Sequence, residues 1–63
     1  DEKRIEHLIS RLMLSNYVNL KWRLDSSGYE FSVDDAYQKT TYYKADTILG
    51  TLEAAMKKLR IKE

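Results

Sequence analysis

The 63-residue chain has no cysteine, no proline and a single histidine. Without cysteine it cannot form a disulfide bond, and with one histidine it lacks the ligands of most zinc sites. Its two glycines, Gly28 and Gly50, are too few for a glycine-rich phosphate loop. We therefore expect no metal ion and no organic cofactor.

Excess charge and long apolar runs are missing as well. Eleven basic residues stand against ten acidic ones, and a net charge of +1 argues against a protein that binds mainly through a positive field. No apolar run approaches the ~20 residues of a membrane span, and no signal peptide is visible. We expect one small domain that does not bind a membrane and lies in the cytoplasm. A chain this short buries only about 60% of its unfolded surface, so self-association would add stability.

The pattern at residues 17–25 and 29–34 predicts a β-hairpin. Apolar and polar residues alternate in both segments, which places the apolar side chains on one face of a strand pair. The segment Asp25–Gly28 has the composition of a turn, and Gly28 can adopt a positive φ there. The residues expected on the apolar face are Val18, Leu20, Trp22, Leu24, Tyr29, Phe31 and Val33.

The turn also predicts a register for this hairpin. Leu24 would face Tyr29, Trp22 would face Phe31, and Leu20 would face Val33. On the other face, Arg23 would lie opposite Glu30 with Lys21 on the diagonal, a favourable arrangement of charges. A shift by one residue would set the apolar face of one strand against the charged face of the other.

Two amphipathic helices are predicted, at about residues 2–14 and 46–61. Their apolar residues recur with the helical period. We expect Asp46 to be the N-cap of the second helix and Gly50 to mark a close approach to the sheet. We interpret the polar side of the first helix as solvated. The apolar stripes are Ile5, Leu8, Ile9, Leu12 and Met13 in the first helix, and Ile48, Leu49, Leu52, Ala55, Met56 and Leu59 in the second.

The segment 34–44 has no clear period. Thr40-Thr41-Tyr42-Tyr43 favours a strand, whereas Asp35 with Gln38 resembles a capping box that would begin a helical turn. We expect a turn and then an edge strand at about residues 39–43. The predicted fold is a small two-layer α+β domain of order α-β-β-(β)-α, with Trp22 and Phe31 at the centre of the core between the sheet and both helices.

Side chains able to support catalysis are scarce. His7 stands beside only Glu6 and Ser10, so we interpret it as a partly exposed residue at the edge of the apolar stripe. Asp34 and Asp35 are adjacent, and neighbouring residues of a strand point to opposite faces, so they do not suit a shared ligand. We expect a protein that is not an enzyme.

Tyrosines supply the best functional indication. The core does not account for all of Tyr17, Tyr37, Tyr42 and Tyr43, and tyrosine is enriched at binding surfaces. This favours a small protein-interaction module or regulator that binds a protein partner or a second copy of itself. It would bind through a tyrosine-rich edge or the open sheet face. The residues expected to bind the partner are Tyr37, Lys39, Tyr42, Tyr43 and Lys44.

Nucleic-acid binding is the alternative, through the basic and aromatic sheet face of Tyr17, Lys21, Arg23 and Lys39. The element order resembles that of double-stranded-RNA-binding domains, and three strands followed by a helix are similar to the arm-binding domains of phage integrases. The second helix is preceded by Lys44-Ala45-Asp46 and not by the basic signature of the RNA-binding domains. We therefore assign no functional residue of either family to this chain. A third reading is a structural subdomain of a longer chain.

Overall fold

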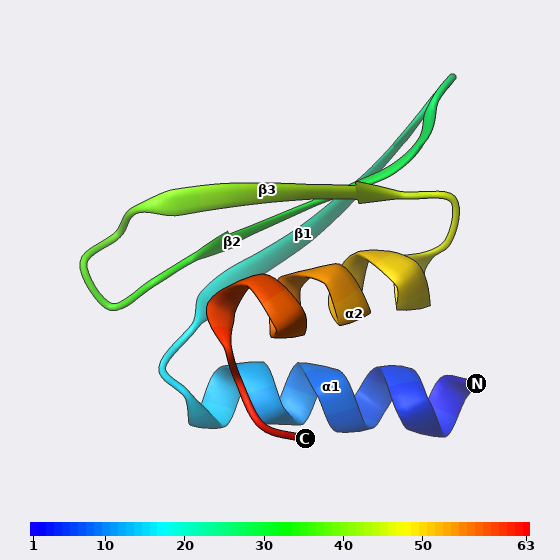
Figure 1. The fold of residues 1–63 in the computed structure, drawn as a ribbon. Helices are drawn as coiled ribbons and strands as arrows, with labels where there is room; N and C mark the ends of the chain where they lie inside the picture. The colour runs from blue at the N-terminus through cyan, green and yellow to red at the C-terminus, as the bar shows by residue number, and fades with distance from the viewer.

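A computed structural model describes residues 1–63 and confirms the predicted α+β class. One helix precedes and one follows three strands in the sequence, and the strands form one antiparallel sheet in the order β1-β2-β3 (Figure 1). The uncertain third strand is present. The elements are α1 (Glu2–Leu14), β1 (Val18–Asp25), β2 (Gly28–Asp34), β3 (Thr40–Ala45) and α2 (Ile48–Leu59).

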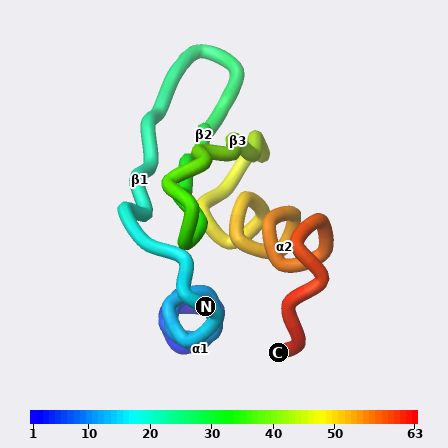
Figure 2. The backbone as a smooth tube through the Cα atoms, turned by 90° about the vertical axis from the view of Figure 1, so that its left-hand side faces the viewer, coloured from blue at the N-terminus to red at the C-terminus, as the bar shows by residue number.

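Both helices lie on the same side of the sheet (Figures 1 and 2). α2 packs against β2 and β3, and α1 packs alongside α2. The two helices run in the same direction, so their N-terminal ends share one end of the molecule. The opposite face of the sheet carries no helix and is open to solvent.

The β1–β2 register is confirmed near the turn and wrong farther from it. Trp22 pairs with Phe31, and the Arg23–Glu30 and Leu24–Tyr29 pairs also form. The expected Leu20–Val33 pair is absent, because an irregularity between Val18 and Lys21 shifts the register.

Asn19 explains the shift. Its φ is 58°, a left-handed conformation that asparagine tolerates better than most residues, and it inserts an extra residue into the strand. Val18 then pairs with Asp34 and is 48% exposed, so it does not share the apolar face as predicted. Leu24 keeps its pairing but lies near the hairpin tip and is 66% exposed.

The turn between β1 and β2 contains only Ser26 and Ser27, one residue shorter at each end than the predicted Asp25–Gly28 loop. An Asp25 carboxylate oxygen accepts hydrogen bonds from the backbone N–H of Ser27 at 2.8 Å and from its hydroxyl at 2.7 Å. Gly28 takes the predicted positive φ, at 118°. A Cβ there would lie 2.7 Å from the carbonyl oxygen of Ala45, so the position requires glycine for space as well as for conformation.

The segment between β2 and β3 forms a turn, as expected, and not the alternative helix. Asp35 organises it, because one of its carboxylate oxygens accepts hydrogen bonds from the backbone N–H groups of Tyr37 and Lys39. Gln38 has a φ of 63° at the tip. In β3 the half-buried residues alternate with exposed ones, so Tyr43 faces the helices and Tyr42 faces solvent.

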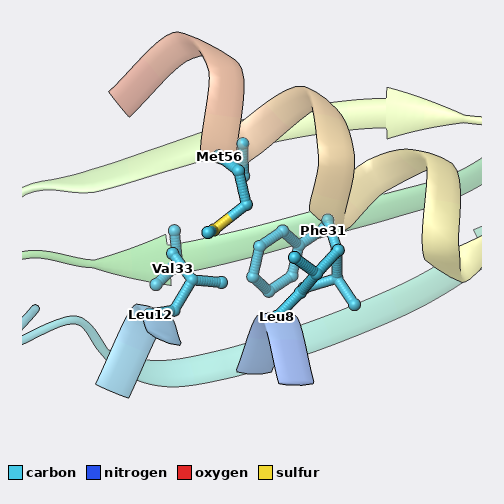
Figure 3. Packing of buried hydrophobic residues seen from close by; sticks show 7 residues of the cluster. Leu8, Leu12, Phe31, Val33 and Met56 are labelled. Atoms are coloured by element: carbon cyan, nitrogen blue, oxygen red, sulfur yellow. The ribbon is translucent and has the colours of Figure 1, made fainter. Parts of the chain in front are cut away.

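The core lies between the sheet and both helices (Figure 3). α1 and α2 cover Phe31 and Val33 of the central strand, and Trp22 stacks on Phe31 with ring centroids 4.6 Å apart. This confirms the predicted pairing at the centre of the core, although Trp22 itself is half-buried. The buried apolar residues are Leu8, Leu12, Phe31, Val33, Leu52, Ala55 and Met56.

Thr47, and not Asp46, is the N-cap of α2. Its hydroxyl accepts a hydrogen bond from the Gly50 N–H at 2.9 Å, whereas Asp46 lies one residue outside the helix. The helix ends at Leu59, two residues earlier than predicted, because Arg60 adopts a left-handed conformation with φ 57°. The Ile61 N–H then donates to the carbonyl of Met56 at 3.0 Å, which closes the helix end in a Schellman arrangement.

The polar side of α1 is not simply solvated, because the segment after α2 crosses it. Arg11 donates to the carbonyl of Lys62 at 3.0 Å, and His7 Nε2 lies 3.1 Å from the carbonyl oxygen of Glu63. Arg4 forms ion pairs with the carboxylates of Glu63 and Glu53. The hydrogen bond to Glu63 raises the pKa of Arg4 above its usual value.

Gly50 makes the close approach that the sequence analysis expected. A Cβ at this position would lie 3.0 Å from the Ala45 Cβ and 3.0 Å from the Thr47 hydroxyl oxygen that caps the helix. Gly50→Ala should therefore fail to give the gain of about 1 kcal/mol that alanine normally brings inside a helix. Urea unfolding of Gly50→Ala should show no such gain over the wild type. A full gain from Gly50→Ala alone would contradict the contact.

Arg60 has a left-handed backbone conformation that is strained for any residue with a Cβ. Arg60→Gly should raise the free energy of unfolding by about 0.5–1 kcal/mol, because glycine adopts this conformation without strain. Arg60→Ala is the matched control: it removes the same charge but keeps the Cβ, and it should show no such gain. Equal stability of the two variants in thermal unfolding would refute the explanation.

Candidate open-face binding site

Three strands place their polar side chains on the open face in aligned rows. One row runs Arg23–Glu30–Lys44 and the next Lys21–Ser32–Tyr42, both set by the strand registers. Near the other end of the strands, Asn19 and Thr40 flank Asp34. The face therefore brings together residues from segments that lie up to 25 positions apart in the sequence.

Tyr42 dominates the middle row. Its side chain is 64% exposed although it stands in the middle of a strand, and it is the only aromatic residue that the alternation of the three strands directs to this face. Two shallow hollows of about 330 and 340 Å³ adjoin the row, and both are lined by Lys21, Ser32 and Tyr42. The surface is thus grooved on either side of an exposed aromatic ring.

Charges on this face are mostly unpaired. Arg23 and Glu30 are cross-strand neighbours as predicted, yet they form no ion pair, and neither does Lys21. Only Lys44 has a partner on this side: its ammonium lies 3.5 Å from the Asp25 carboxylate and 3.2 Å from the Ser27 hydroxyl. The ion pairs with Glu30 that the predicted register favours for Lys21 and Arg23 are therefore absent.

Asp34 closes one end of the groove. It accepts hydrogen bonds from the Thr40 hydroxyl and from the side-chain amide of Asn19, the latter at 2.9 Å. The hydrogen bond from Thr40, then that from Asn19 and the positive charge of Lys21 lower the pKa of Asp34 below its ordinary 3.8. The residue pattern did not indicate Asn19 and Thr40 as members of this site. An asparagine inside an otherwise apolar-alternating strand was the available signal, because asparagine is typical of bulges and turns.

The structure divides the predicted partner-binding residues. Tyr42 and Lys44 lie on the open face, whereas Tyr43 lies on the core side with its ring centroid 6.2 Å from that of Phe31. Tyr37 is 92% exposed in the β2–β3 turn, and the exposed Lys39 occupies the same turn.

The residues of the alternative nucleic-acid face are divided too. Lys21 and Arg23 are on the open face, with Lys39 in the turn beyond it. Tyr17 is half-buried, and its side chain packs against the hydrophobic core. Its backbone N–H donates a hydrogen bond to the Leu12 carbonyl at 3.1 Å, and this bond closes the end of α1. Tyr17 therefore does not share a surface with Lys21.

Chemically, the face offers an aromatic ring, two unpaired cations, hydroxyl groups and, beside the Asp25–Lys44 pair, the carboxylates of Glu30 and Asp34. These groups suit binding by stacking, hydrogen bonds and charge. His7 lies away from it on α1, beside the segment that follows α2. Neither helix is long and apolar enough to cross a lipid bilayer.

No family model, curated protein sequence or solved structure matches this chain. The geometry of the open face therefore supplies the basis for a functional proposal.

Acid should destabilise the fold through two carboxylates. The pKa of Asp34 is lowered as described, and hydrogen bonds from Ser27, together with Lys44, lower that of Asp25. A lowered pKa in the folded state adds stability above the ordinary value of 3.8, and this contribution is lost as the pH falls through the folded-state value. Urea unfolding between about pH 6 and about pH 2 should show the loss. Asp34→Asn should weaken the dependence, and an unchanged dependence would contradict the hydrogen-bond assignment.

Proposed function

We propose that this chain is a non-catalytic protein-interaction module that binds an acidic segment of a partner protein on the open face of its sheet. The observation that carries the proposal is the exposed Tyr42 ring on the same face as Lys21 and Arg23, neither of which has an ion-pair partner. Tyrosine and arginine are the residues that most often dominate binding energy at protein interfaces.

The arrangement of these side chains favours an acidic peptide as the ligand of the open face. Lys21 lies in the same row as Tyr42, so a partner carboxylate could pair with the ammonium while an adjoining apolar side chain covers the ring. The hollow lined by Trp22, Arg23 and Tyr42 can accommodate such an apolar side chain beside the ring. Arg23, in the adjacent row, supplies a guanidinium able to bind a second carboxylate with two hydrogen bonds.

Nucleic-acid binding is the second candidate, favoured by the same aromatic ring beside two cations, on which a base could stack. It ranks lower because Glu30 and Asp34 share the face and Lys44 is engaged with Asp25. A nucleic-acid strand carries a phosphate at every nucleotide and needs positive charge along its whole path, which these carboxylates interrupt, whereas a peptide needs to place carboxylates only at Lys21 and Arg23.

A titration followed by NMR separates the two candidates. The labelled chain is titrated with a short capped peptide of alternating Glu and Val, and separately with a thymidine single strand. The peptide should shift the resonances of Lys21, Ser32 and Tyr42 because it lies along their row. Tyr42→Ala should weaken binding by about tenfold or more, as expected for removal of an aromatic anchor.

Tyr37→Ala is the matched control, since it removes an even more exposed tyrosine from the turn outside the face. It should leave peptide affinity unchanged. Equal losses in both variants, or shifts scattered away from the open face, would overturn the proposal. Tighter binding of the single strand than of the peptide would favour the nucleic-acid candidate.

A further inference from the structure

The two ends of the molecule carry opposite charge. α1 and α2 run in the same direction, so both helix starts lie at one end and both helix ends at the other (Figures 1 and 2). The open-face site uses neither end.

An apolar cleft lies at the end where the helices start. It has a volume of about 300 Å³, and its apolar walls come from Ile5, Tyr29, Ile48 and Leu49. Leu24 pairs with Tyr29 at its edge and leaves 66% of its surface exposed. An apolar surface of this kind, at the end of a small domain, is suited to covering by another protein surface.

The charges around this cleft are acidic. Asp1 lines it, and Asp46 directly precedes Thr47, which also lines it. The nearby side-chain cations do not offset them. Lys3 falls on the opposite side of α1 from Ile5 by the helical period, and Arg4 is paired with Glu53 and Glu63. We call this surface the acidic end.

The opposite end is basic. Lys57, Lys58 and Arg60 surround a shallow open hollow of about 580 Å³ together with Ala54, and none of the three cations forms an ion pair. Met13 and Leu14, in the last turn of α1, are exposed at this same end of the molecule. We call this surface, which combines unpaired cations with exposed apolar side chains, the basic end.

We infer that copies of this chain associate head to tail, with the acidic end of one copy seated against the basic end of the next. The occupant that the acidic cleft requires is an apolar surface bordered by cations, and the basic end of a second copy has that chemistry. A twofold pairing of acidic ends would bring Asp46 of each copy near that of the other and would be repulsive. Head-to-tail contacts leave one acidic and one basic end free, so assembly continues beyond a dimer.

Sedimentation at low ionic strength tests the inference with two charge-reversal variants. The wild-type mass should rise with protein concentration beyond that of a dimer and fall when salt is added. Asp1→Lys combined with Asp46→Lys in one variant, and Lys57→Glu combined with Lys58→Glu in the other, should each hold the chain near the monomer mass of 7.5 kDa, because each variant presents two like-charged ends. An equimolar mixture of the two should associate again, since every contact between unlike variants joins opposite charges.

Thermal unfolding of both variants establishes that they remain folded, as expected for exposed positions. Tyr42→Ala should associate like the wild type, which separates this inference from the open-face proposal. A wild-type chain that stays monomeric at low salt would overturn the inference. So would a mass that stops at a dimer, or a mixture that fails to recover association.

Discussion

The contacts of Trp22 are the constraint on which the rest of the structure depends. Its ring stacks on Phe31 of the central strand, and its indole N–H donates to the Thr51 hydroxyl at 3.0 Å. That hydroxyl in turn donates to the carbonyl of Ile48, at 2.6 Å. One side chain thus joins β1, β2 and α2, with its polar atom satisfied in a half-buried position.

Both proposed surfaces follow from this arrangement. Because side chains alternate along a strand, placing Trp22 toward the helices places its neighbours Lys21 and Arg23 on the open face. The β2–β3 register then aligns Tyr42 with Ser32 and hence with Lys21. The same packing holds α2 alongside α1 in a common direction, which places the starts of both helices at one end of the molecule and their ends at the other.

The periodic spacing of apolar residues predicted the regular elements of the fold. The helices follow from the helical repeat. The strand order and the register near the turn follow from the two-residue alternation of side chains along a strand. The predicted pairing of Leu20 was wrong, because Asn19 adopts a left-handed backbone conformation. This single residue shifts the register without altering the composition of the strand. The periodic spacing was also uninformative in β3, because tyrosine suits both a half-buried and an exposed position, so Tyr42 and Tyr43 could not be assigned to faces. The contacts of His7 and Arg11 with the last residues join positions more than 50 apart, and no local pattern indicates them.

Hydrogen exchange and NOE measurements at the Trp22 indole N–H test the central claim most directly. If Trp22 packs between the sheet and α2 as described, this proton exchanges slowly and NOEs connect the ring to Phe31 and the N–H to Thr51 across the sheet–helix interface. Rapid exchange, with the side chains of Lys21 and Arg23 showing NOEs to α1 or α2, would contradict the assignment of the faces and the site built on it.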